Sequence, residues 1–239
     1  MANMTELSLL ASGITALSPI RECKDGMCAR FINGSWFKLP TYKYGQLAGM
    51  TVSMWIKPSN VSGADARIFE MSNSDKTSRM AMYRDGSSSK LGFSVTRGGK
   101  TTTFVTVEDK SWDDSDVWKH VAWTLGSKSG SLGQPSWTIH IDGNLTATVD
   151  GLYVDAVDLD SAYIGRAASG SQGQYFGYMD SFMMFPVDLS GNEVYLLSQV
   201  RSEPRAWSRG REMRLVGLGV WLDGSMGDAG SMCMMEEFV

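Results

Sequence analysis

The segment at residues 117–145 constrains the fold of this chain more than any other. Two runs rich in Trp, Val and Ile flank a Gly- and Ser-rich loop, and the second run ends in the turn dipeptide Asp142-Gly143. Because successive side chains of a β-strand point to opposite faces, Trp123 and Trp137 each lie on the apolar side of their run. The segment therefore predicts two paired β-strands with an apolar inner face.

The same alternation of apolar and polar residues recurs along the chain, and it is clearest in Met50–Pro58. The chain has 26 glycines and only 6 prolines, which suits many short strands separated by turns. A capping box at residues 190–193 predicts one short helix that ends at residue 199. These signals predict an all-β protein, a two-sheet antiparallel β-sandwich with a short C-terminal helix. The strands are expected at residues 29–32, 37–40, 50–58, 67–71, 79–84, 91–95, 101–107, 117–125, 137–141, 146–149, 162–165 and 176–185.

Changes in composition divide the 239 residues into three parts. Residues 1–24 are weakly patterned and form a lead-in segment or an edge strand. Residues 25–200 form the sandwich domain, because one all-β domain can reach this length. Residues 201–239 are Arg-rich and then Gly- and Met-rich, and their role as a solvated linker or as an interaction tail stays open.

The charge pattern excludes some classes of partner. The formal net charge is −4, so the chain as a whole has no attraction for nucleic acid or an anionic membrane. No run approaches the 18 or so apolar residues of a transmembrane helix. Residues 1–18 lack the basic start and apolar core of a signal peptide. The protein is expected to be either intracellular or a piece of a longer secreted chain.

Three cysteines and two histidines limit the options for bridges and metals. Cys23 and Cys28 bracket a turn-forming sequence, which predicts a small disulfide loop, with two free thiols as the alternative. With Cys233 far away and only His120 and His140 to add, a structural zinc site is not expected.

Four Asn-x-Ser/Thr triplets fall at a terminus or at a turn, where a glycan can be accommodated. The residues concerned are Asn3, Asn33, Asn60 and Asn144. The last three are the glycosylation candidates, and they favour a secretory origin without deciding it.

The order of these elements resembles the concanavalin A-like jelly roll of lectins and glucanases, within its laminin-G-like and pentraxin-like branch. The resemblance spans about residues 28–199. The blocks that support it are MTVSMWIKP (50–58), IF (68–69), LGFSV (91–95), WKHVAWT (118–124), WTIHIDG (137–143), YIG (163–165), FGYMDSF (176–182) and LSGNEVYLL (189–197).

This family binds carbohydrate, protein or lipid head groups, often with calcium (Ca²⁺), and usually as one module of a larger extracellular protein. The resemblance thus implies a secreted or cell-surface chain. It places Asp75 near one calcium-ligand position and Asp180 where the family has a structural carboxylate, so these two are the metal candidates. The calcium loop of pentraxin-like members is occupied here by Arg166-Ala167-Ala168, which has no carboxylate.

Three functions from different classes remain. The leading hypothesis is a non-catalytic module that binds a glycan, because sugars stack on exposed aromatic rings and are oriented by polar neighbours. A protein-binding adhesion module is the alternative. A glycoside hydrolase is disfavoured, because no strand holds two carboxylates at the spacing that such an enzyme needs. The predicted ligand-binding residues are Trp55, Tyr83, Arg84, Trp112, Tyr175 and Tyr178.

Overall fold

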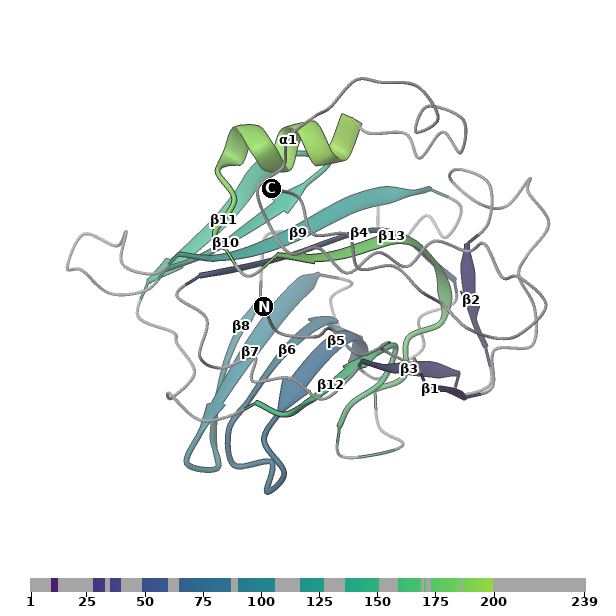
Figure 1. Ribbon diagram of the computed structural model, residues 1–239, viewed down its shortest axis with the longest axis vertical. Helices are drawn as coiled ribbons and strands as arrows, with labels where there is room; N and C mark the ends of the chain where they lie inside the picture. The colour runs from purple at the N-terminus through teal and green to yellow at the C-terminus, as the bar shows by residue number, and fades with distance from the viewer. Residues whose placement is uncertain are drawn as a thin grey trace, which may run out of the picture.

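A computed structural model gives the architecture of the chain (Figure 1). It describes residues 10–12, 28–32, 35–39, 49–59, 65–86, 90–105, 117–126, 136–150, 159–168, 170, 173–185 and 187–199. This part contains thirteen strands and one helix. Their bounds are β1 (Leu10–Ser12), β2 (Ala29–Phe31), β3 (Trp36–Leu39), β4 (Met50–Pro58), β5 (Ala66–Ser72), β6 (Arg79–Arg84), β7 (Leu91–Arg97), β8 (Lys100–Val105), β9 (Lys119–Gly126), β10 (Ser136–Ile141), β11 (Asn144–Asp150), β12 (Ser161–Ile164), β13 (Gly177–Phe185) and α1 (Gly191–Gln199).

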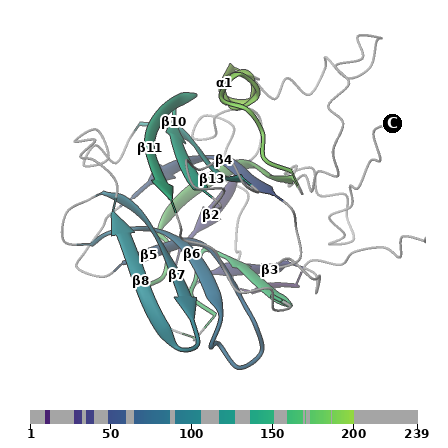
Figure 2. The ribbon, with the colours of Figure 1, turned by 90° about the vertical axis from the view of Figure 1, so that its left-hand side faces the viewer.

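The strands form two antiparallel sheets that face each other as layers, with α1 on the far side of one of them (Figures 1 and 2). The seven-stranded sheet has the order β1-β3-β12-β5-β6-β7-β8. The six-stranded sheet has the order β11-β10-β9-β4-β13-β2. The predicted all-β sandwich is therefore confirmed, and the lead-in segment contributes β1, which pairs with β3 at a sheet edge.

The main core lies between the two sheets. On β4, the alternate side chains Val52, Met54 and Ile56 point inward and are fully buried, as the alternation predicts. Trp137 of the six-stranded sheet meets Phe93 of the other sheet, with ring centroids 5.1 Å apart. Buried aromatic rings of this size contribute much of the apolar area that holds a sandwich together.

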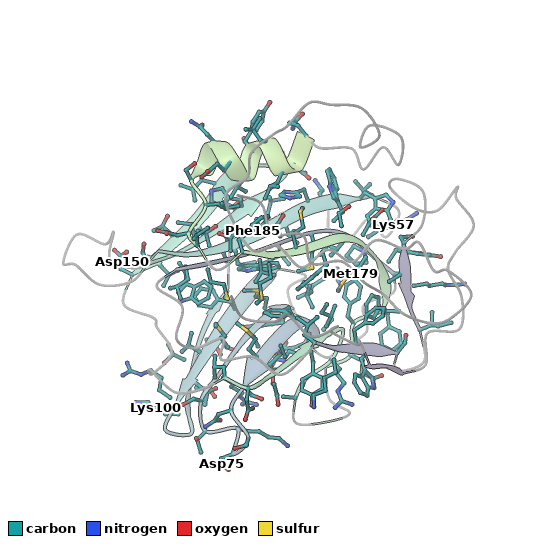
Figure 3. All side chains as sticks on the ribbon, in the orientation of Figure 1. Lys57, Asp75, Lys100, Asp150, Met179 and Phe185 are labelled. Atoms are coloured by element: carbon teal, nitrogen blue, oxygen red, sulfur yellow. The ribbon has the colours of Figure 1, made fainter. Side chains whose placement is uncertain are left out.

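A second, smaller core lies between α1 and the outer face of the six-stranded sheet. The outer face of a sheet is the face turned away from the other sheet. Phe185 of β13 packs there against Val194 and Leu197 of the helix (Figure 3). The predicted capping box is present, because Glu193 Oε2 accepts a hydrogen bond from the Ser190 backbone N–H at 2.7 Å and the Ser190 hydroxyl faces the Glu193 N–H at 3.4 Å.

Several predictions made from the sequence fall on residues that the structure does not describe. They are the tail at residues 201–239, the ligand candidate Trp112, Cys23, and the glycosylation candidates Asn33 and Asn60. Within the described residues, no helix has the length and apolar character needed to cross a membrane.

Candidate functional site

The predicted ligand-binding residues do not converge on one place. Trp55 of β4 and Tyr178 of β13 lie on the outer face of the six-stranded sheet, whereas Tyr83 of β6 lies on the outer face of the seven-stranded sheet. Tyr175 and Arg84 are buried, with only 2% and 3% of their surfaces exposed. The described candidates therefore occupy three separate environments.

Tyr175 is part of the interior rather than of a surface. Its ring meets Phe31 edge to face at 5.6 Å, and its hydroxyl donates a hydrogen bond to the Tyr178 carbonyl at 3.0 Å. Burial raises the pKa of the Tyr175 phenol far above its ordinary value, and the nearby Arg84 charge opposes that rise. Both side chains are buried and offer no open face to a sugar.

The two metal candidates lie on different sheets. Asp75 is exposed in the turn between β5 and β6, while Asp180 lies on β13, next to Met179, in the six-stranded sheet (Figure 3). The Ser181 hydroxyl donates a hydrogen bond to Asp180 Oδ1 at 3.2 Å. Within the described ranges, no group of three or more His, Cys, Asp or Glu side chains is placed to hold a metal ion. Calcium binding through Asp75 or Asp180 stays a prediction.

Cys28 is buried and disulfide-bonded. Its partner lies outside the described residues, so the pairing with Cys23 stays a prediction. Asn144 is exposed at the start of β11, where its side-chain amide donates a hydrogen bond to the Asp142 carbonyl at 3.3 Å. Its position on a turn is the kind that a glycan requires.

The strongest candidate site is a group of aromatic and cationic side chains at the β3–β12 end of the seven-stranded sheet. We call it the Trp36–Tyr163 cluster, and it consists of Trp36, Lys38, Tyr163 and Arg166. Because β3 and β12 are antiparallel neighbours with Lys38 opposite Tyr163, these side chains share the outer face. The alternate residues Phe37, Leu39, Ala162 and Ile164 enter the core. The rings of Trp36 and Tyr163 meet edge to face with centroids 5.7 Å apart.

A glycine positions the arginine of this cluster. Gly165 follows β12 with φ +85°, and a Cβ at this position would lie 2.5 Å from the Phe31 ring. Only a residue without a side chain fits such a place, so the chain turns there and carries Arg166 back over the aromatic pair. The Arg166 guanidinium carbon lies 3.9 Å from the Trp36 ring centroid and 4.6 Å from that of Tyr163.

The cations of the cluster have aromatic contacts but no ionic partner among the residues that the structure describes. Lys38 Nζ lies 5.9 Å from the Tyr163 ring centroid. In the part of the chain that the structure describes, no carboxylate lies within ion-pair distance of Lys38 or Arg166. The buried Nε atom of Arg166 has no hydrogen-bond partner. The donors that this half-buried side chain can offer a ligand are therefore its terminal nitrogens, since Nε is itself buried.

A buried carboxylate beside the cluster fixes the neighbouring loop. Glu70 of β5 lies opposite Tyr163, is fully buried, and accepts a hydrogen bond from the Ala168 N–H at 2.9 Å. Arg67 Nε lies 3.4 Å from Glu70 Oε2, an ion pair without hydrogen-bond alignment, and its guanidinium lies 4.7 Å from the Tyr83 ring centroid. Among the residues of the seven strands of this sheet, Glu70 is the one acidic side chain.

A second aromatic group lies on the opposite outer face but is more covered. Tyr178 has Arg30 and Lys57 each 5.7 Å from its ring centroid and Trp118 at 6.5 Å. Tyr178 is 9% exposed and Trp55 is 8% exposed, whereas Trp36 and Tyr163 are half-buried. Trp36 and Tyr163 are therefore less covered than Tyr178 and Trp55, while Trp118 is half-buried as they are.

The sequence prediction missed all four residues of the cluster, Trp36, Lys38, Tyr163 and Arg166. The signal was present, since alternation in Trp36–Leu39 places Trp36 and Lys38 on the same polar side, and it places Tyr163 between two core residues. What the sequence could not supply was the pairing of β3 with β12, which are more than a hundred residues apart.

Known proteins resemble this chain in sequence pattern and in fold. A family model described as the Concanavalin A-like lectin/glucanases superfamily matches residues 32–195. No curated protein matches the sequence.

Solved structures share the fold at low identity. Domain 4 of AbnA, an extracellular GH43 arabinanase from Geobacillus stearothermophilus solved with arabinotriose, has a TM-score of 0.59 and 15% identity, over 74% of this chain and 79% of that one. The binding domain of Paraclostridial Mosquitocidal Protein 1 has a TM-score of 0.61 and 15% identity, over 80% and 47%. A botulinum neurotoxin type C structure, concerned with cell entry through two ganglioside molecules, has a TM-score of 0.61 and 13% identity, over 81% and 46%. The match spans about half the length of these two toxin chains.

Proposed function

Because the chain belongs to the Concanavalin A-like lectin/glucanases superfamily, we propose that it is a non-catalytic module that binds carbohydrate in an extracellular or cell-surface protein. The observation that supports this proposal best is the half-buried Trp36–Tyr163 pair with cationic hydrogen-bond donors beside it. Pockets for small ligands combine apolar and aromatic surface with a few placed polar groups in the same way.

The chemistry of the cluster suits a sugar. One face of a pyranose ring presents C–H groups, which pack on an aromatic ring, while its hydroxyls and substituents need hydrogen-bond partners at the edge. The parts of Trp36 and Tyr163 that Arg166 leaves exposed supply the apolar surface, and Arg166 and Lys38 supply donors on the same side of the sheet. A ligand bound there therefore has both kinds of contact within one small area.

Two of the similar structures support a binding role of this kind. The arabinanase domain was solved in complex with arabinotriose, and the neurotoxin structure concerns interaction with gangliosides. Both ligands contain carbohydrate. At 15% and 13% identity, these structures support a shared fold, and the ligand of this chain is inferred from its own residues.

The carboxylates favour binding over hydrolysis. Glycosidases with two catalytic carboxylates need one as acid and one as base or nucleophile, both in reach of the scissile bond. On the strands of the seven-stranded sheet the one acidic residue is Glu70, which is fully buried and already contacted by Arg67 and the Ala168 N–H.

A glycan array with and without calcium tests the function, and two matched variants test the site. Trp36→Ala should lower the affinity for the best array glycan by at least about tenfold, since a lost aromatic platform costs more than 1 kcal/mol. Trp118→Ala, on the opposite outer face, should leave affinity unchanged. Thermal unfolding of both variants checks that they remain folded.

The alternatives predict different results. Loss of binding in Trp118→Ala alone would move the site to the Tyr178 side. Absence of glycan binding across the array, together with stable capture of a protein partner, would replace the proposal with an adhesion module. Release of reducing sugar from a bound oligosaccharide would show a hydrolase.

A further inference from the structure

We propose that the Trp36–Tyr163 cluster selects glycans that carry a carboxylate, as sialic and uronic acids do. This inference rests on the proposed carbohydrate binding and narrows its ligand class. It follows from the charge balance of the cluster, from the orientation that stacking imposes on Arg166, and from the contacts that already engage the neighbouring Glu70 carboxylate.

The cluster has positive charge that the described residues do not balance. Lys38 and Arg166 are both half-buried and neither has an ionic partner among those residues. Glu70, opposite Tyr163, is contacted by Arg67 and by the Ala168 N–H, so its charge is already compensated. Lys38 and Arg166, which have no ionic partner among the described residues, thus lie close together on a chain whose formal net charge is −4. Such a local field attracts an anionic group to this patch.

Stacking on the aromatic rings uses the flat face of the Arg166 guanidinium and leaves the N–H groups at its edge for an anion. The guanidinium uses its contacts with the Trp36 and Tyr163 rings for cation–π attraction, at 3.9 Å and 4.6 Å from their centroids. None of its N–H groups donates a hydrogen bond to a described residue, and because its Nε atom is buried, its two terminal nitrogens are the donors open to a ligand. A guanidinium edge offers donors in a planar fork that matches the two oxygens of a carboxylate.

Both cations are within reach of the same ring. Lys38 Nζ and the Arg166 guanidinium carbon lie 5.9 Å and 4.6 Å from the Tyr163 centroid. One acidic sugar can therefore place its carboxylate against the cations and its C–H surface against the parts of Trp36 and Tyr163 that Arg166 does not cover. A neutral sugar would leave these charges without a partner, so the site should bind an acidic sugar more tightly than a neutral one.

Esterification tests the inference on the unaltered protein. Titration calorimetry compares α2,3-sialyllactose, trigalacturonic acid and the strongest acidic ligand of the array with the methyl esters of their carboxylates. We expect the esters to bind about tenfold more weakly or worse, because a charge-assisted hydrogen bond is lost while the sugar ring is kept.

Charge-matched variants locate the carboxylate. Arg166→Gln should weaken binding of the free acid by about tenfold and have little effect on the ester, and Arg166→Lys should retain part of the affinity. The control is Lys100→Gln, which removes one positive charge from the first residue of β8, the strand at the other edge of the same sheet (Figure 3). It should leave both affinities unchanged.

Each result has a definite meaning. If the bound glycans are neutral, or if esterification leaves affinity unchanged, carboxylate selection is wrong and carbohydrate binding stands. If sulfated glycans bind and tolerate esterification of their carboxylates, the anion is a sulfate and the assignment is likewise wrong. Equal losses of affinity for the free acid in Arg166→Gln and Lys100→Gln would show that the net charge of the protein, and not a contact with Arg166, causes the preference. If no glycan binds at all, the proposed function fails first.

Discussion

Gly165 links the interior of the sandwich to the candidate site. Its φ of +85° lies in a region that residues with a side chain rarely adopt, and an added Cβ would meet the Phe31 ring at 2.5 Å. Its N–H donates to the Ile68 carbonyl at 3.0 Å, which anchors the turn that positions Arg166. A single backbone position therefore serves both the core and the cluster.

We predict that Gly165→Ala lowers the free energy of unfolding by roughly 2–4 kcal/mol, since it adds a steric clash to the cost of the left-handed backbone. The control is Gly99→Ala, at φ +79° with nothing within 4 Å of the added Cβ. This control should show the conformational cost alone, roughly 1 kcal/mol. Urea denaturation measures both. Equal losses would show that the Phe31 contact relaxes without cost and that Gly165 has no special role in packing.

The ligand residues expected from the sequence illustrate the limits of reasoning one residue at a time. Tyr175 follows a flexible loop and Arg84 precedes the Asp85-Gly86 turn, which suggested exposure, yet both side chains are buried. A ring beside a loop can point into the core or into solvent, and the direction depends on which strand lies opposite it. The sequence alone does not show which strand that is.

At the level of the elements, the strands were predictable and one register shift was not. Alternation in Met50–Pro58 and Arg79–Arg84 gave the strand bounds as observed, because one apolar and one polar face leave a clear pattern. The run Phe182–Phe185 is apolar throughout, so it has no such pattern. The structure shifts register between Asp180 and Met183, with Ser181 at φ +50°, and so turns Met183 and Phe185 toward α1.

Helix α1 and the strands beneath it enclose two histidines. His120 of β9 is fully buried and its Nε2 atom lies 2.8 Å from the Ser53 hydroxyl. His140 of β10 lies beside Gly191, the first residue of α1, and is 4% exposed. Burial lowers the pKa of His120 to about 4, against the opposing pull of the Asp142 carboxylate, and burial also lowers the pKa of His140.

These shifts predict loss of stability in acid. The unfolded chain binds a proton at each histidine near pH 6.5, whereas the folded chain takes one up at His120 only near pH 4. The free energy of unfolding should therefore fall as the pH drops from about 6.5 to 4, by about 3 kcal/mol from His120 alone. Urea denaturation at several pH values measures the slope, and His120→Gln should flatten it. An unchanged slope in that variant would place the acid sensitivity elsewhere.

Across the whole molecule, the sandwich brings distant segments together and thereby makes the site. Lys38 and Tyr163 lie opposite each other although 125 residues separate them in the chain. The fold class followed from the sequence because every strand signal is local, whereas the cluster depends on which strands pair. The alternation of polar and apolar residues in β3 and β12 indicated that Trp36, Lys38 and Tyr163 point outward. The pairing of the two strands then places these side chains next to each other.

A nuclear magnetic resonance titration of the tryptophan indole N–H signals with the best array glycan shows directly whether a glycan binds at the Trp36–Tyr163 cluster. The chain has 8 tryptophans, and Trp36→Phe, Trp55→Phe and Trp118→Phe identify three of the signals. If the glycan binds at the Trp36–Tyr163 cluster, the chemical shift of the Trp36 signal changes in proportion to the bound fraction, while the signals of Trp55 and Trp118 do not move. A titration in which Trp55 or Trp118 shifts and Trp36 does not would contradict binding at this cluster.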